Sequence, residues 1–101
     1  MVEFVPSEFY LSQNFPNPFS EYTNIKYCLP VKAEVNLNIY DTDGNIVKEL
    51  VNDTQEAGTY EIKLNSLDFS EGQYYYAFEA VDMCSGLNKI FKNTKKMILI
   101  K

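Results

Sequence analysis

The sequence predicts an all-β domain, an immunoglobulin-like antiparallel β-sandwich of about seven strands. Two observations predict this fold. Apolar and polar side chains alternate in several short runs, and turn residues separate these runs every 8 to 12 residues or so, with no convincing helical period. The chain has 101 residues, of which 46% are hydrophobic and 15% aromatic. This composition suits one small folded domain with a single core.

The first element is a short strand at residues 9–13, with Phe9 and Leu11 on one face. We interpret residues 1–8 as a linker remnant or an expression start, and residues 9–101 as the domain. The strand runs into Asn-Phe-Pro-Asn-Pro-Phe, in which two prolines remove backbone donors and disfavour helix. We expect its phenylalanines, Phe15 and Phe19, to plug one end of the core, and its prolines to keep this edge from pairing further.

The middle of the chain alternates between strands and turns. Strands are predicted where every second side chain is apolar, at residues 23–29, 34–39, 59–64 and 73–81, and a further strand is predicted at residues 46–51, directly after a turn. The run 46–51 would also fit one or two helical turns. In the longest strand Tyr74 and Tyr76 share one face with Phe78 and Ala80. The connections are predicted at residues 29–33, 41–45, 52–58, 67–72 and 82–88, with Leu67 and Phe69 as apolar anchors and with Gly44, Gly58 and Gly72 as turn glycines.

The closing strand lies within residues 89–101 and ends in Lys-Lys-Met-Ile-Leu-Ile-Lys. Its apolar residues must pack on a sheet, while lysines on both sides of them suit a strand at a sheet edge. The net charge of the chain is −5, yet its last thirteen residues hold five of the nine lysines and no acid. An acidic body without arginine is a poor nucleic-acid binder, so we expect this basic end to meet its own domain or a protein partner.

Residues that could carry chemistry are few. Without histidine the chain lacks Ser-His and Cys-His nucleophile systems, and Cys28 and Cys84 are too few for a zinc site, so we expect no enzyme and no cofactor. Two free thiols are the simpler interpretation of the cysteines, although a disulfide is possible in an oxidising compartment. Asp41 and Asp43 are interpreted as turn residues. Their spacing to Gly44 is not that of an EF-hand, which leaves only a weak calcium site open.

Several functions remain open on composition alone. No stretch has the roughly 18 consecutive apolar residues of a membrane span. The N-terminus lacks the pattern of a signal peptide, so the chain is either cytoplasmic or a segment of a longer secreted protein. The eight tyrosines raise the alternative of a sugar-binding module, in which Tyr75 would be exposed, although Tyr74 and Tyr76 fit a core more simply. Exposed strand edges raise the alternative of a homodimer formed by strand exchange.

A series of motifs along the chain resembles a known family. These are Phe9-x-Leu11-x-Gln13-Asn14-Phe15-Pro16-Asn17-Pro18-Phe19, Thr23-x-Ile25-x-Tyr27-x-Leu29-Pro30, Val35-x-Leu37-x-Ile39-Tyr40-Asp41-x-x-Gly44, Ala57-Gly58-x-Tyr60, Ser70-x-Gly72-x-Tyr74-x-Tyr76 and Thr94-Lys95-Lys96-Met97-x-Leu99-x-Lys101. Together they resemble the type A C-terminal sorting domain of the type IX secretion system of Bacteroidota. The resemblance covers residues 9–101. The loop 82–88 is longer than the usual turn of the family.

This resemblance implies an address on an exported protein rather than a catalyst. The domain would follow a cargo domain, pass through the periplasm, and be recognised by an outer-membrane translocon. A sortase-like cysteine endopeptidase would then cut near residues 1–9 and attach the cargo to the cell surface, or the cargo would be released outside the cell. By matching positions, the resemblance implies recognition through Gly58, Gly72, Tyr74, Lys95, Lys96, Met97, Leu99 and Lys101.

Overall fold

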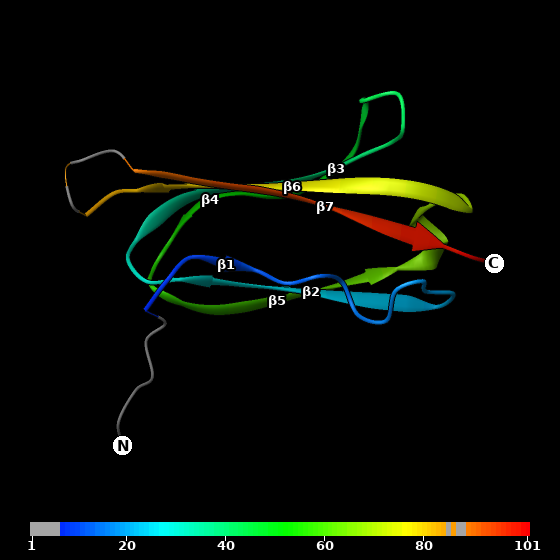
Figure 1. Cartoon of the computed structure of the whole chain (residues 1–101), viewed down its shortest axis with the longest axis horizontal. Coiled ribbons are helices and arrows are strands. Elements are labelled where there is room, and N and C mark those ends of the chain that lie inside the picture. The colour runs from blue at the N-terminus through cyan, green and yellow to red at the C-terminus, as the bar shows by residue number, and fades with distance from the viewer. Residues whose placement is uncertain (1–6, 85, 87–88) are drawn as a thin grey trace, which may run out of the picture.

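The computed structural model describes residues 7–84, 86 and 89–101, and it confirms the all-β sandwich (Figure 1). Two antiparallel sheets face each other, one of three strands in the order β1-β2-β5 and one of four in the order β4-β3-β6-β7. The strands are β1 (Tyr10–Leu11), β2 (Tyr22–Leu29), β3 (Ala33–Tyr40), β4 (Ile46–Gln55), β5 (Gly58–Asn65), β6 (Gly72–Asp82) and β7 (Ile90–Leu99), with a single 3-10 turn, η1 (Ser66–Asp68).

The core lies between the sheets and follows the period-two pattern of the sequence. In β2, for example, Ile25, Tyr27 and Leu29 are buried, while Lys26 between them faces solvent. Successive side chains of a strand point to opposite faces, so a sheet with one wet face selects this alternation. The predicted inner face of the longest strand is confirmed. The buried apolar side chains are Leu11, Phe19, Ile25, Tyr27, Leu29, Ala33, Val35, Leu37, Ile39, Leu64, Phe69, Tyr74, Tyr76, Phe78, Ala80, Met97 and Leu99.

β4 is a strand, as predicted, but it is longer than predicted. It continues to Gln55 through the polar residues that were assigned to a turn, and these pair with Ala33 to Asn36 of β3. β4 lies at the edge of the four-stranded sheet, where it is largely exposed, and two register shifts interrupt its ladder. An exposed edge strand needs no apolar alternation, which explains why the sequence pattern ended too early.

Two predicted core residues are exposed instead. Phe15 is 78% exposed and Leu67 is 84% exposed, whereas Phe19 and Phe69 are buried as expected. Phe15 pairs with Asn24 by an isolated bridge, and its ring lies outside the core. Leu67 sits in η1, whose buried residue is Ser66. Both errors fall in irregular segments, where no period tells which side chain turns inward.

The loop predicted at residues 82–88, which contains Cys84, falls between two strands of the structure. β6 ends at Asp82 and β7 begins at Ile90, so the predicted hairpin lies between them, although Ser85, Leu87 and Asn88 lie outside the described residues. Cys84 is exposed and Cys28 is half-buried, and both are free thiols. Of residues 1–8, which we interpret as a linker remnant or an expression start, residues 1–6 lie outside the described residues.

Candidate functional site

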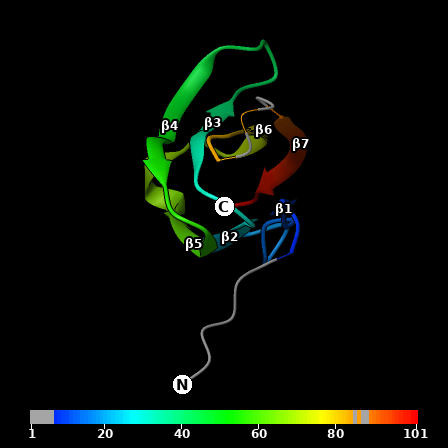
Figure 2. The same cartoon turned by 90° about the vertical axis from the view of Figure 1, so that its left-hand side faces the viewer.

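The segment 12–19, which we call the strap, joins the two sheets along one side of the sandwich. In Figure 2, β1 and β7 lie on this side, and β4 and β5 lie on the other. Phe15 exchanges two backbone hydrogen bonds of 2.9 Å with Asn24 of β2. Phe19 then donates its N–H to the carbonyl of Ile98 at 3.0 Å and accepts from the N–H of Ile100 at 2.9 Å. The strap therefore crosses from the edge of one sheet to the edge of the other.

Asn14 holds the bend of the strap from inside. This side chain is buried, and its Nδ2 donates to the Thr23 hydroxyl at 3.0 Å and to the Pro16 carbonyl at 3.3 Å. The Thr23 hydroxyl in turn donates to the same carbonyl at 2.8 Å. The Pro16 carbonyl, which a regular strand would pair with a backbone N–H, thus accepts its hydrogen bonds from side chains.

Asn17 and Gln13 bind the outer edge of β7. The Oδ1 of Asn17 accepts the N–H of Ile98 at 3.0 Å, and the Nε2 of Gln13 donates to the carbonyl of Lys96 at 2.6 Å. These groups of β7 point away from β6, because the backbone groups of a strand alternate between its two edges. The strap thus satisfies the C-terminal half of an edge that would otherwise be open to another chain.

Tyr76 ties the strap to the four-stranded sheet. Its ring is fully buried in β6, and its hydroxyl accepts the N–H of Asn14 at 2.8 Å and donates to the carbonyl of Ser12 at 2.7 Å. Burial disfavours the tyrosinate and raises the pKa of Tyr76 to about 12, against an opposing hydrogen bond from Asn14. The hydroxyl therefore stays protonated at neutral pH and can donate to the strap.

The apolar residues of the closing motif lie in the core. Met97 and Leu99 are fully buried on the inner face of β7, so a partner cannot reach their side chains in the folded domain. Lys95 belongs to the same inner set, is half-buried, and lies opposite Tyr76. Lys96 faces the outer side, is exposed, and lies opposite Tyr75. Of the recognition residues predicted in the closing motif, the lysines are therefore those that a partner can contact.

The charges of these lysines are not neutralised by the domain. Lys92 lies 3.5 Å from a carboxylate oxygen of Glu79. For Lys95 and Lys96, in contrast, no carboxylate of the described residues lies within 4.0 Å. Lys101 is exposed, and its backbone N–H donates to Glu71 at 3.1 Å. The exposed ammonium group of Lys96 and the half-buried one of Lys95, neither with a carboxylate in reach, are available to an acidic partner.

Tyr74 and Gly72 have structural positions beside the closing strand. Gly72 pairs with Leu99, and Tyr74 pairs with Met97. The Tyr74 hydroxyl donates to the carbonyl of Ser70 at 2.6 Å, four residues upstream, as in the tyrosine corner of immunoglobulin-like sandwiches. Gly72 has a φ of 150° with no atom within 4 Å of an added Cβ, so backbone conformation rather than space selects glycine there.

Gly58 is separated from the other predicted site residues. It pairs with Leu29, the last residue of β2, whereas Phe19, just before β2, lies beside Leu99. An eight-residue strand of about 3.3 Å per residue separates these two ends. Figure 1 shows the turn before β5 at the end of the sandwich opposite the C-terminus. The structure therefore brings together seven of the eight predicted residues along β7 and its neighbour β6, and leaves Gly58 apart.

Sequence reasoning missed the residues that join the strap to the four-stranded sheet. They are Gln13, Asn14, Asn17 and Tyr76. A signal was present, since asparagine beside proline commonly supplies side-chain hydrogen bonds to irregular backbone. The pairing of residues more than sixty positions apart was not visible in any local pattern.

The described residues offer little for chemistry of other kinds. No group of three or more Cys, Asp or Glu side chains is placed to hold a metal ion within the described part of the chain. At the turn proposed for calcium, one oxygen of Asp41 accepts the N–H groups of Asp43 and Asn45 at 2.9 and 3.0 Å. That oxygen therefore serves the turn itself. No helix in ranges 7–84 and 89–101 is long and apolar enough to cross a membrane.

Comparison with known proteins gives one family. A family model described as "Secretion system C-terminal sorting domain" matches residues 13–99. No curated protein and no solved structure gives a match to this sequence. The matched range begins in the strap, at Gln13, and ends at Leu99, the last residue of β7. The strap from Gln13 onward and all of β7 thus lie within it, whereas Ser12 and Lys101 lie just outside.

Proposed function

Since the chain belongs to the secretion system C-terminal sorting domain family, we propose that the edge formed by the strap and β7 is what the type IX machinery reads. Family membership means that the domain is a sorting signal of an exported protein, carried behind a cargo and directed across the outer membrane to the cell surface or beyond. Members of such a family are addresses rather than catalysts, and we propose that this domain has no enzymatic activity of its own.

One observation carries the proposal about recognition. Lys95 and Lys96 project from the closing strand without an ion-pair partner among the described residues, beside the strap that fixes the same strand in place. An acidic patch on the translocon would bind the ammonium groups of these lysines on a strand whose backbone the strap holds in place. The other predicted residues would then act indirectly. The fold of β6 and β7, which positions the lysines, depends on Met97, Leu99, Gly72 and Tyr74, whereas Gly58 would act only through folding of the distant turn.

Transplantation tests the proposed function. Residues 1–101 would be fused behind a periplasmic reporter in a host that has the type IX system, and the reporter would be measured in periplasm and medium. We expect the fusion to leave the periplasm and a fusion truncated after Thr94 to remain there. Retention of the intact fusion in the periplasm, with the domain shown to be folded, would reject the proposal.

Cleavage at the start of the domain is a second part of the proposal. The ring of Phe9 stacks on Phe91 at 5.7 Å, which supports a folded domain that begins at Phe9, while Ser7 and Glu8 are exposed. A sortase-like endopeptidase would therefore cut within residues 1–9, after periplasmic transit, and leave the cargo on the surface. Mass spectrometry of the exported reporter would locate its new C-terminus, and a terminus after residue 9 would contradict this part.

An assembly role is a second candidate function, and one observation favours it. The outer edge of β7 at Ile90–Thr94 has no backbone partner among the described residues, because the strap covers only the later part of the strand. Two such edges would pair as a continuous sheet in a homodimer. Sedimentation of the isolated chain over a range of concentrations would test this, and a monomer throughout would exclude it.

A further inference from the structure

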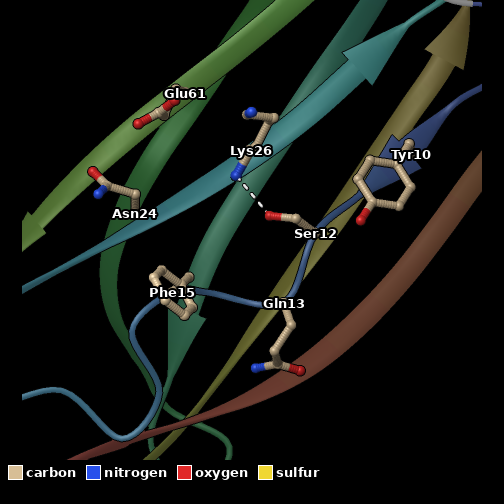
Figure 3. Close-up of a pocket in the computed structure, with 7 residues that line it drawn as sticks. All are labelled: Tyr10, Ser12, Gln13, Phe15, Asn24, Lys26 and Glu61. Carbon is tan, nitrogen blue, oxygen red and sulfur yellow. Dashed lines mark hydrogen bonds between the residues drawn. The ribbon is translucent and has the colours of Figure 1, made fainter.

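A shallow groove lies on the outer face of the three-stranded sheet. Its volume is about 340 Å³, and Figure 3 shows it between the strap and the neighbouring strands β2 and β5. It faces away from the core. Its lining combines two aromatic rings with hydroxyl, amide, ammonium and carboxylate groups from Tyr10, Ser12, Gln13, Phe15, Asn24, Lys26 and Glu61.

The two aromatic rings have no packing role that accounts for them. Tyr10 is 52% exposed and Phe15 is 78% exposed, and in Figure 3 they lie on either side of Ser12. In the Asn-Phe-Pro-Asn-Pro-Phe motif, Asn14, Asn17 and Phe19 each stabilise the strap or the core. Phe15 contributes its backbone to the pairing with Asn24, but its ring meets solvent. The ring is thus free to contact a ligand.

The floor between the rings is fixed by hydrogen bonds. Ser12 donates its N–H to the carbonyl of Lys26 at 2.8 Å, and its hydroxyl accepts the N–H of Lys26 at 2.9 Å. Phe15 is held by its two bonds to Asn24. The rings of Tyr10 and Phe15 are therefore carried by hydrogen-bonded backbone rather than by a free loop, which lowers the entropic cost of binding a ligand.

Three polar side chains of the groove, those of Asn24, Lys26 and Glu61, keep their hydrogen-bonding capacity. Lys26 and Glu61 face each other in register, yet within the described ranges neither forms an ion pair shorter than 4.0 Å. Together with the amide of Asn24 they supply donors and acceptors between two apolar rings. A phosphate would be repelled by Glu61, a cation by Lys26, and a purely apolar ligand would bury both charges at a cost.

We propose that this groove binds a neutral oligosaccharide. Pyranose rings have apolar C–H faces, which would stack on Tyr10 and Phe15, and hydroxyls that both donate and accept, which suits Asn24, Lys26 and Glu61. Tyr10 lies in β1 and Phe15 in the strap, five positions further along the chain, and we assign the two rings to two different sugar units. This site is on a different face from Tyr75. It shares Ser12, Gln13 and Phe15 with the strap, but it is proposed independently of the sorting function.

Titration of the complete 101-residue chain with soluble neutral oligosaccharides of two to six units tests the proposal. After a glycan array selects the probes, NMR would follow the backbone amides of Ser12, Phe15 and Lys26. We expect their signals to shift, with a Kd on the order of 1 mM because the groove is shallow. Insoluble polysaccharide, added in a pull-down, distinguishes binding inside a long chain from binding of free oligosaccharides.

Matched variants give the decisive comparison. Tyr10→Ala and Phe15→Ala should each weaken binding about tenfold, whereas Tyr75→Ala, which removes an exposed ring from the other sheet, should change it less than twofold. Equal thermal unfolding would show that the variants stay folded, which the exposure of Phe15 favours. The proposal is overturned if no neutral oligosaccharide binds, if only anionic glycans bind, or if Phe15→Ala binds as the parent does.

Discussion

Replacing Tyr76 by phenylalanine removes one oxygen atom from the centre of the domain and leaves its ring in place. That hydroxyl lies 2.8 Å from the backbone nitrogen of Asn14 and 2.7 Å from the carbonyl oxygen of Ser12. The substitution therefore tests whether the strap is held by the core or only lies against it. If the core holds the strap, loss of this one oxygen must lower the free energy of unfolding and loosen the strap along its side of the sandwich.

The structure gives the expected magnitude. The Asn14 N–H is buried, and leaving such a donor unsatisfied costs about 1 to 3 kcal/mol; losing the bond to the Ser12 carbonyl adds about 0.5 to 1.5 kcal/mol. We expect Tyr76→Phe to lower the free energy of unfolding by about 2 to 4 kcal/mol. For a domain of this size, that lowers Tm by roughly 10 to 25 °C.

Urea denaturation followed by circular dichroism measures this effect. Tyr74→Phe is the matched control, because its hydroxyl makes one bond, to the Ser70 carbonyl, and its loss should cost about 1 kcal/mol. Hydrogen exchange supplies a local readout. The amides of Ile98 and Ile100, which the strap covers, should exchange faster in Tyr76→Phe than in Tyr74→Phe. Equal destabilisation by both variants, with unchanged exchange at these amides, would refute the reasoning.

Three further predictions concern pH, packing and backbone. The pKa of Tyr76 is raised from 10.0 in the unfolded chain to about 12 in the folded domain. The protonated hydroxyl therefore contributes about 3 kcal/mol to the free energy of unfolding, fully present below pH 10 and lost as pH rises to about 12. In urea titrations the parent should therefore lose more stability over this range than Tyr76→Phe, and equal losses would count against it. Met97→Ala should lower the free energy of unfolding by about 2 to 5 kcal/mol, since the side chain is fully buried, and a cost below about 1 kcal/mol by calorimetry would contradict that burial. Gly72→Ala should cost about 1 to 3 kcal/mol because its φ is 150°, although space is free; unchanged stability in urea would show that the backbone relaxes there without strain.

The regular part of the fold could be predicted from the sequence because its signal is local. Alternation such as Ile25, Tyr27 and Leu29 around exposed Lys26 is imposed by a sheet with one buried face, so it marks both the strand and its inner side. Edge strands carry a weaker signal. β4 was recognised, but its polar C-terminal part was assigned to a turn, since an exposed edge imposes no apolar pattern.

The candidate site could be predicted only in part, because it joins the two ends of the chain. The lysines of the closing motif indicated an edge, and the structure confirms that β7 pairs only with β6 among the strands. What covers that edge depends on single hydrogen bonds, such as the one between Asn17 and Ile98, which are 81 positions apart. Neither periodicity nor propensity specifies contacts of this kind. The exposed ring of Phe15 was missed for the same reason.

Export of a double variant tests most directly the claim that the closing strand is read from outside. Lys95→Gln with Lys96→Gln removes two charges that have no ion-pair partner among the described residues and keeps the side-chain stems, so stability should change by less than about 1 kcal/mol. Lys92→Gln is the control, because Lys92 lies on the same strand as Lys95 and Lys96 but forms an ion pair with Glu79 of β6. We predict that the reporter carrying the double variant stays in the periplasm while the control is exported. Normal export of the folded double variant would show that these lysines only protect the edge of the sheet.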